Sequence, residues 1–289
     1  MATSWLQVDV FAEGPYRGNP LAVIQDAASL TGRQMQAIAS EMNLSETTFV
    51  MDVGRDAYEV RIFTPNSEIG FAGHPTLGTF WALNHLGLLD DDAVQRSRVG
   101  ETRVWLDGEV AWFERTGTSG EDLERTEAKS SANIAEALGL PLADIGLEAR
   151  ELGRNGLLRP AFSNAGLEDQ LMVPLKNLDS LRACRPVPDL LGQLAPVGLY
   201  CFTGHRAGVL RARGFFPGVG VAEDPATGSA AGALGLYLAS RVGAIDFTIE
   251  QGVEMGRPSR LDVSAASPDR VKVGGKCHLV LSGRIDVLP

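Results

Sequence analysis

Apolar and polar residues alternate in short runs along most of the chain, which predicts a protein built largely of short β-strands. In residues 6–12, Leu6, Val8 and Val10 alternate with polar neighbours, as in a strand with one buried face. The turn dipeptide Asp107-Gly108 separates two such runs and predicts a hairpin. The expected strands are 6–12, 21–24, 45–51, 58–63, 99–105, 109–114, 149–152, 157–162, 171–173, 199–202, 209–216, 260–263, 270–273 and 278–287.

Four segments depart from this alternation and predict helices. Residues 30–42 carry apolar side chains on one stripe after a plausible cap, Thr31, and residues 131–138 form a short helix. Residues 76–88 and 230–239 are apolar on nearly every side, so we expect both helices to be buried. Strands with few helices, and without the parallel β-α-β pattern of a nucleotide-binding sheet, predict the α+β class.

The two buried helices follow similar sequences, at 73–83 and 223–234. In each, a polar residue precedes proline, and a glycine, a small hydroxyl residue and an apolar helix come next. Asp224-Pro225 is typical of an N-cap and a first helical residue. Two copies of one plan predict a pseudo-twofold pair of domains, with a site where the two helix N-termini converge. The pairs that align without a gap are His74/Asp224, Pro75/Pro225, Gly78/Gly228 and Thr79/Ser229.

A polar run, 116–131, is the best candidate boundary between the halves. We therefore expect an N-terminal lobe at 1–116, completed by the C-terminal strand 278–289, and a C-terminal lobe at 117–277.

Composition excludes several functional classes. A chain of 289 residues, with 44% hydrophobic and 21% charged residues, is typical of a globular protein with a substantial core. Its net charge of −10 argues against nucleic acid and anionic membranes as partners. No apolar run approaches the ~20 residues that span a bilayer, and the start lacks a signal-peptide pattern, so we expect a cytoplasmic protein.

Cysteines and histidines indicate neither a disulfide framework nor a metal site. Cys184, Cys201 and Cys277 are an odd number without a CxxC pair, which favours reduced thiols. The four histidines show no metal-ligand spacing, and no glycine-rich nucleotide motif is present. We therefore expect neither metal nor cofactor.

Three side chains are candidates for proton transfer: Glu46, His74 and Asp224. A carboxyl at Glu46, between a helix and an apolar strand, would be partly desolvated and suited to act as both acid and base. Each has a structural alternative: Glu46 as a capping-box or surface residue, and His74 and Asp224 as helix caps. Two helix N-termini could also bind a carboxylate and stabilise enolate-like charge, which favours a racemase, an epimerase or an isomerase.

Four motifs together closely resemble the PhzF family of phenazine biosynthesis-like proteins, which are related in fold to diaminopimelate epimerase. They are Phe11 with 18–23, then 43–49, 70–78 and 223–230, in the family's order. The resemblance implies two pseudosymmetric α+β lobes, each a barrel-like, mostly antiparallel sheet wrapped around a central helix, with the site in the cleft between them. It also implies a cofactor-independent isomerase that acts on a small carboxylated metabolite, usually as a homodimer.

The resemblance also assigns residues. Glu46 matches the acid–base glutamate that takes a proton from one carbon and returns it at another. His74, Asp224 and Ser229 match the residues that hold the substrate and help in proton transfer. Gly73 and Gly228 match backbone positions that bind substrate at the helix N-termini.

Related epimerases use one cysteine at each helix start, but none of the three cysteines here lies near either start, which disfavours two-thiol racemisation. Three functions remain open. One is isomerisation of a small carboxylate, with trans-2,3-dihydro-3-hydroxyanthranilate as the compound named for the family. The second is racemisation or epimerisation by Glu46 with His74 or Asp224, and the third is non-catalytic binding. Arg154 and Arg159 could bind a second carboxylate or lie in a solvated hairpin, and we favour the hairpin.

Overall fold

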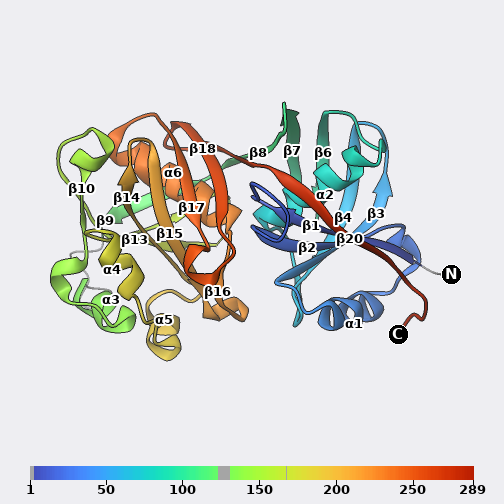
Figure 1. Cartoon of the computed structure of the whole chain (residues 1–289), viewed down its shortest axis with the longest axis horizontal. Helices are drawn as coiled ribbons and strands as arrows, with labels where there is room; N and C mark the ends of the chain where they lie inside the picture. The colour runs from blue at the N-terminus through green and yellow to red at the C-terminus, as the bar shows by residue number, and fades with distance from the viewer. Residues whose placement is uncertain (1–2, 123–130, 167) are drawn as a thin grey trace. The chain divides into compact units, whose positions relative to one another are not determined.

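The computed structural model describes residues 3–122, 131–166 and 168–289 (Figure 1). These residues form a mixed α+β fold with a large, mostly antiparallel sheet and six α-helices, which confirms the predicted class. Within the same residues, no helix combines the length and the apolar character needed to cross a bilayer. By Cα proximity the chain divides into unit 1, Met1–Glu114 with Gly274–Pro289, and unit 2, Arg115–Val273.

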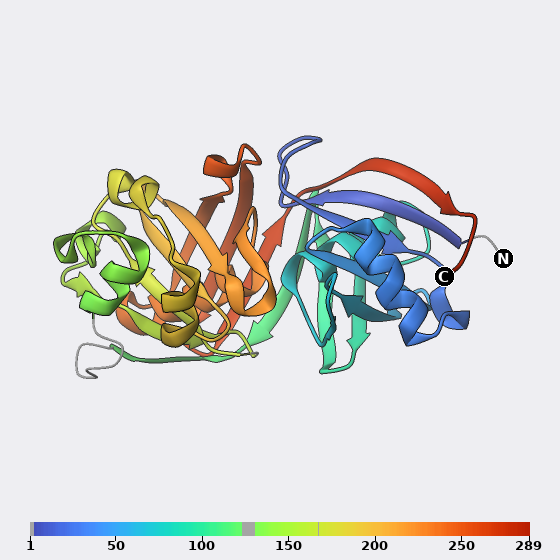
Figure 2. The same ribbon diagram turned by 90° about the horizontal axis from the view of Figure 1, so that it is seen from below.

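Unit 1 contains two helices, α1 (Gly32–Met42) and α2 (Gly73–His85), and a short 3-10 helix, η1 (Ala27–Ser29). Helix α1 lies along the strands of this unit, as Figure 2 shows. The last strand of the chain, β20, pairs with the first, β1, from Thr3 to Val10. The strands of unit 1 are β1 (Thr3–Val10), β2 (Asn19–Ile24), β3 (Glu46–Val53), β4 (Ala57–Phe63), β5 (Glu68–Ile69), β6 (Asp92–Ser97), β7 (Gly100–Asp107) and β20 (Cys277–Ile285).

Unit 2 contains α3 (Ser131–Leu138), α4 (Leu178–Ala183), α5 (Pro188–Leu194) and α6 (Gly228–Val242). Its 3-10 helices are η4 (Leu142–Asp144), η5 (Ala149–Leu152), η6 (Pro217–Val219) and η7 (Val253–Met255). Strands β8 (Val110–Thr116) and β19 (Arg270–Gly275) run from one unit into the other. The remaining strands are β9 (Thr118–Asp122), β10 (Leu147–Glu148), β11 (Leu157–Leu158), β12 (Ala161–Asn164), β13 (Gln170–Pro174), β14 (Leu199–Arg206), β15 (Val209–Phe216), β16 (Val221–Asp224), β17 (Ile245–Gln251) and β18 (Ser259–Ser267).

Strand pairing follows the same order in both units. In unit 1, β1–β2 is antiparallel, β2–β3 parallel, β3–β4 and β4–β5 antiparallel, β4–β6 parallel and β6–β7 antiparallel. In unit 2, the series from β12 to β18 repeats these six relationships. Helices α2 and α6 therefore occupy equivalent places in the chain, because each connects the two strands of the second parallel pair.

The parallel pairs correct one expectation. The sequence showed alternating strands and little sign of parallel crossovers, yet β2 and β3 are parallel and joined through α1. Parallel strands need a long crossover, and a helix of 11 residues supplies it. The fold is a mixed sheet with helical crossovers rather than a set of hairpins alone.

Helices α2 and α6 are buried as predicted. Ten of the 13 residues of α2 and eleven of the 15 residues of α6 are buried. Helix α2 packs on β1, β2 and β3, and α6 packs on β12, β17 and β18. A Cβ at Gly78 would lie 2.6 Å from side-chain carbons of both Val10 and Leu21, so glycine is what lets α2 approach the sheet.

Helix α1 begins where the sequence indicated. Thr31 is its N-cap, and its side chain and that of Gln34 form a reciprocal capping box. Met35, Ile38 and Ala39 are buried, as the predicted stripe requires. The hairpin over Asp107-Gly108 is also confirmed, with Asp107 paired to Val110.

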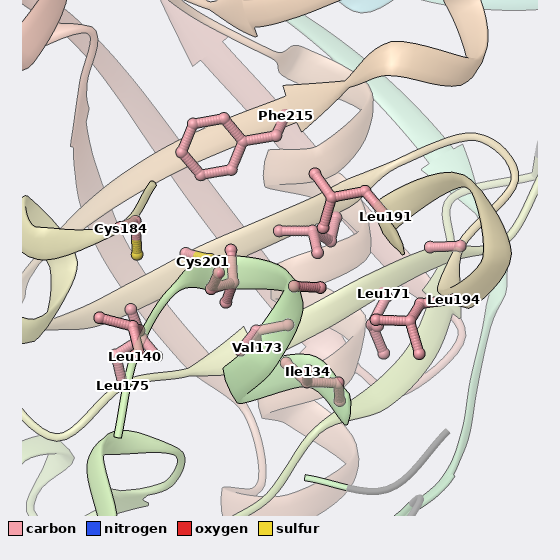
Figure 3. Packing of buried hydrophobic residues seen from close by; sticks show 14 of the residues in the cluster. Ile134, Leu140, Leu171, Val173, Leu175, Cys184, Leu191, Leu194, Cys201 and Phe215 are labelled. Carbon is pink, nitrogen blue, oxygen red and sulfur yellow. The ribbon is translucent and has the colours of Figure 1, made fainter. Parts of the chain in front are cut away.

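Helices α3, α4 and α5 form a layer that the sequence predicted only in part. Figure 3 shows its core, in which Ile134 and Leu191 of the helices pack with Val173 and Cys201 of β13 and β14. Helix α3 was expected, whereas α4 and α5 were missed. Both are short, and their signals are local: Asn177 caps α4, and Pro188 is the first residue of α5.

One further expectation is wrong in detail. Residues 149–152 form η5, a 3-10 helix, instead of a strand. Of the polar run 116–131, residues 123–130 lie outside the described residues, and Thr118–Asp122 forms β9, which pairs with β12. Polar residues suit β9 because only part of it is covered.

Candidate functional site

The buried helices start at positions that correct the proposed alignment of the two halves. Helix α2 begins at Gly73 after Ala72, so His74 is its second residue and not its cap. Helix α6 begins at Gly228 after Thr227, and Asp224 is the last residue of β16. Gly73 is thus equivalent to Gly228, and His74 to Ser229. The gapless alignment missed this because Pro75 lies inside α2, whereas Pro225 precedes α6.

Both helix starts lack a side-chain cap. The side chain of Ala72 has no group that could accept a hydrogen bond, and the Thr227 side chain makes no capping bond to α6. The first N–H groups of a helix have no intrahelical acceptor and carry partial positive charge. Gly73 and Gly228 add no side chain over these groups, so each start can receive a small anion.

In unit 1, Glu46 and His74 face each other. Glu46 is the first residue of β3, and its Oε2 lies 3.4 Å from Nε2 of His74. The side chains are 15% and 4% exposed, respectively. The contact is not aligned as a hydrogen bond, because Nε2 of His74 has no hydrogen-bond partner among the described residues. A carboxylate and an imidazole therefore meet at the uncapped start of α2.

Burial keeps His74 neutral. It lowers the pKa of the imidazole from 6.5 to about 3, because the charged form would lose its hydration. At neutral pH His74 can donate one hydrogen bond and accept another, but it cannot supply a positive charge.

Asn19 and Ser45 complete the arrangement in unit 1, and sequence reasoning missed their roles. Nδ2 of Asn19, which is fully buried, lies 3.2 Å from Nδ1 of His74. The Ser45 hydroxyl donates to Oδ1 of Asn19 at 3.1 Å, and Nδ2 is the amide atom that faces His74. Nδ1 of His74 then accepts, and the single imidazole proton lies on Nε2, toward Glu46.

In unit 2, Asp224 belongs to a hydrogen-bonded loop before α6. Its Oδ2 accepts from the Thr227 hydroxyl at 2.5 Å. Nε2 of Gln251, a fully buried residue, donates to the Asp224 carbonyl at 2.7 Å, and Oε1 accepts from Tyr200 at 2.6 Å. Burial raises the pKa of the Tyr200 hydroxyl, and the nearby Asp224 raises it further. The loop is thereby held in place by side chains from two strands.

Ser229 also contacts a side-chain amide. Nε2 of Gln170, the first residue of β13, donates to Oγ of Ser229 at 3.3 Å. Gln170 is 6% exposed, and its Oε1 is buried with no hydrogen-bond partner in the described part of the chain. Nothing in the sequence pattern singled out Gln170, because it stands 59 residues from Ser229.

The remaining candidates lie elsewhere. Cys184, Cys201 and Cys277 are reduced and buried, and none belongs to the first turn of α2 or α6. Burial raises the pKa of the Cys201 and Cys277 thiols. Arg154 donates to the Val242 carbonyl at the last residue of α6, and α6 is about 20 Å long, so Arg154 is remote from Ser229.

Arg154 lies between the paired strands β10 and β11 in the chain, and Arg159 follows β11. Within residues 3–122, 131–166 and 168–289, no group of three or more His, Cys, Asp or Glu side chains is arranged to hold a metal ion.

Comparison with known proteins gives matches along nearly the whole chain. Residues 8–283 match the sequence model of a family described as phenazine biosynthesis-like protein (PhzC-PhzF). A protein of Pseudomonas fluorescens, named trans-2,3-dihydro-3-hydroxyanthranilate isomerase, is 37% identical over 94% of this chain and 95% of its own. A PhzF-family crystal structure from Bacillus anthracis superposes with a TM-score of 0.83 at 25% identity, covering 99% of this chain and 100% of that one.

A more distant structure shows the breadth of this fold. A probable proline racemase from Agrobacterium radiobacter superposes with a TM-score of 0.63 at 11% identity, over 99% of this chain and 93% of that one. At this identity the likeness concerns the fold alone.

Proposed function

This chain belongs to the phenazine biosynthesis-like (PhzF) family and is an isomerase, and we propose that Glu46 moves a proton between two carbon atoms of a small carboxylated metabolite without a metal or cofactor. The observation that carries the proposal is the 3.4 Å contact between Glu46 and neutral His74 at the uncapped start of α2. The carboxylate of the substrate and Glu46, which carries the proton, would thus meet at the start of α2.

The chemistry assigns complementary roles to the two side chains. As a carboxylate, Glu46 removes a proton from carbon, and as the resulting acid it returns that proton at another carbon. The Nε2–H of His74 donates to an oxygen atom of the substrate, so it stabilises the negative charge that develops as the C–H bond breaks. Because His74 stays neutral, it does not compete as a proton source.

We further propose that residues at the start of each buried helix bind substrate. Gly73 and Gly228 offer backbone N–H groups to carboxylate oxygens, while Asp224 and Ser229 bind polar groups of the substrate. The repeated pairing order and the equivalent helix starts support a pair of pseudosymmetric lobes, each with a barrel-like sheet around its central helix. Each helix start would stabilise negative charge that develops on a carboxylate bound there.

The substrate named for the Pseudomonas fluorescens relative, an amino carboxylate on a partly reduced ring, is the first compound to test. We expect wild-type protein in deuterated water to exchange a C–H or form product from this compound or another small carboxylate. The Glu46→Gln variant, which keeps the shape but cannot take a proton, should lower the rate by at least about 100-fold. Nuclear magnetic resonance (NMR) spectra over time measure both.

Glu59→Gln is the matched control, because Glu59 is exposed on β4 and the change in charge is the same. It should leave the rate unchanged. Exchange that survives Glu46→Gln would show that another group is the base. Deuterium that enters at a single carbon, without movement of a double bond, would indicate a racemase. Tight binding of a compound without exchange of its hydrogens would indicate a binding protein.

A further inference from the structure

A side-chain amide contacts the second residue of the buried helix in each unit. Asn19 opens β2 and bonds His74 of α2, whereas Gln170 opens β13 and bonds Ser229 of α6. Strands β2 and β13 hold the same place in the pairing order, as do α2 and α6. The two amide contacts are therefore equivalent features of the internal repeat, although the bonded groups differ.

We propose that Asn19 and Gln170 are a matched pair of positioning residues that fix His74 and Ser229 as hydrogen-bond donors toward the substrate. The proposal rests on the proposed function, because it explains how two residues of that site are oriented. Its structural part can be tested without turnover.

The unit 1 contact determines which imidazole nitrogen carries the proton. Asn19 is fully buried and is oriented with Oδ1 toward the Ser45 hydroxyl, which leaves Nδ2 facing His74. In this orientation Nδ2 donates to Nδ1 of His74, at 3.2 Å. A neutral imidazole with an accepting Nδ1 has its proton on Nε2, the atom beside Glu46.

The contact in unit 2 likewise leaves its helix residue, Ser229, as a hydrogen-bond donor. Oγ of Ser229 accepts from Gln170, so the hydroxyl hydrogen remains to be donated elsewhere. The other amide atom, Oε1, is buried without a hydrogen-bond partner among the described residues. A buried acceptor of this kind is costly unless a ligand supplies a donor. The site therefore suits a carboxylate that also carries an N–H or O–H group.

The proton position on His74 is measured by nitrogen-15 NMR, with its signals assigned by their loss in His74→Gln. We expect wild-type His74 at pH 7 to be neutral and protonated on Nε2. In Asn19→Asp, the new carboxylate accepts a hydrogen bond instead, so Nδ1 becomes protonated. Wild-type protonation on Nδ1, or no change in Asn19→Asp, would overturn the proposal.

Two further variants keep this test decisive. Asn66→Asp makes the same chemical change at an exposed residue of unit 1 and should leave the His74 signals unchanged. If Asn19→Asp does not fold, Ser45→Ala serves instead. It removes the donor that orients Asn19, so both neutral forms of His74 should appear, and a single unchanged form would contradict the orienting role.

Gln170 is tested by its own side-chain amide signals and by kinetics. The bonded amide proton of Gln170 should shift in Ser229→Ala, and an unchanged signal would refute the contact. With trans-2,3-dihydro-3-hydroxyanthranilate, Gln170→Met and Ser229→Ala should each raise KM about tenfold, and the double variant should be no worse than Ser229→Ala alone. Losses that multiply would show that the two residues act independently.

Gln193→Met, at an exposed position of α5, is the control. If the compound is not turned over by wild type, the substrate assignment fails, whereas the two sets of NMR signals still decide whether the amides orient His74 and Ser229.

Discussion

At the scale of single residues, the site depends on groups that are held neutral or oriented by neighbours. His74 is the clearest case, because burial places its pKa well below that of an imidazole in water. His74 lies in the first turn of α2 and contacts Asn19 on one side and Glu46 on the other. Acid should therefore destabilise the fold in a predictable range of pH.

The first prediction concerns stability at acid pH. The unfolded chain protonates His74 near pH 6.5, whereas the folded chain does so only near a pH of about 3. Between these values the unfolded state binds more protons, so the free energy of unfolding falls as pH falls, by about 1.4 kcal/mol per pH unit. In His74→Gln this contribution is absent, so the free energy of unfolding should fall less steeply as the pH falls below about 6.5.

Urea unfolding at pH 7, 6, 5 and 4 would measure this difference. His85→Gln, at an exposed residue stacked on Trp81, is the control and should keep the wild-type slope. If His74→Gln follows a curve parallel to wild type, His74 is not the group that titrates.

Sequence alone could identify the residues with proton chemistry but not those that orient them. Glu46 and His74 stood out by residue type and by motif, and the structure places them 3.4 Å apart. Asn19 and Gln170 carry no titratable group, and each meets its partner across more than 50 residues of chain. Such contacts arise from strand pairing, which residue periodicity does not specify.

At the scale of elements, close packing of the buried helices explains their glycines. Glycine is normally unfavourable within a helix, by about 1 kcal/mol relative to alanine. Gly78 nevertheless lies in the middle of α2, because Val10 and Leu21 occupy the space that a side chain would need. The stability gained by packing α2 closely on the sheet is therefore larger than the cost of a glycine in the helix.

The second prediction follows from this packing. Gly78→Ala should destabilise the protein by about 1–3 kcal/mol despite its better helix propensity, because its Cβ would lie 2.6 Å from two side-chain carbons. In α5, Gly192 has nothing within 4 Å of an added Cβ, so Gly192→Ala should instead stabilise the protein by about 0.5–1 kcal/mol. Opposite shifts of the urea midpoint are expected, and equal shifts would contradict the packing argument.

Elements with strong local signals were predictable. The Thr31 cap and the Asp107-Gly108 turn occur where the sequence indicated, and the predicted apolar helices 76–88 and 230–239 overlap α2 and α6. Helices α4 and α5 were missed because six or seven residues give too little periodicity to recognise. The start of α6 was misplaced because Asp224-Pro225 has the form of a cap, while Thr227 and Gln251 engage Asp224 and its carbonyl within a loop.

At the scale of the whole molecule, each unit has its own hydrophobic core. Phe49 and Met35 belong to a cluster in unit 1, and Phe215 and Leu171 belong to one in unit 2 (Figure 3). The two units also carry different spectroscopic and chemical probes of unfolding. All four tryptophans, which report by fluorescence, lie in unit 1, whereas Cys184 and Cys201, which report by thiol labelling, lie in unit 2. Each unit can therefore be followed separately.

The third prediction is that the two units unfold independently. Gly235→Ala, whose Cβ would lie 2.8 Å from Val271 and 2.9 Å from Val263, should destabilise unit 2 by about 1–3 kcal/mol. In a Cys277→Ala background, thiol labelling should then begin at lower urea while the tryptophan fluorescence midpoint stays constant. A common shift of both probes would show that the chain unfolds as one cooperative unit.

The second position of α2 and of α6 has a consequence for how such a protein can diverge. A side-chain amide, Asn19 in one half and Gln170 in the other, contacts a histidine and a serine, respectively. A duplicated ancestor could thus acquire different chemistry in its two halves by changing the residue after each glycine and adjusting the length of the amide side chain, while the strands and the helix kept their places. New activities on this scaffold then cost few substitutions and little stability, which makes residues 74 and 229 the natural positions at which to redirect it by directed evolution.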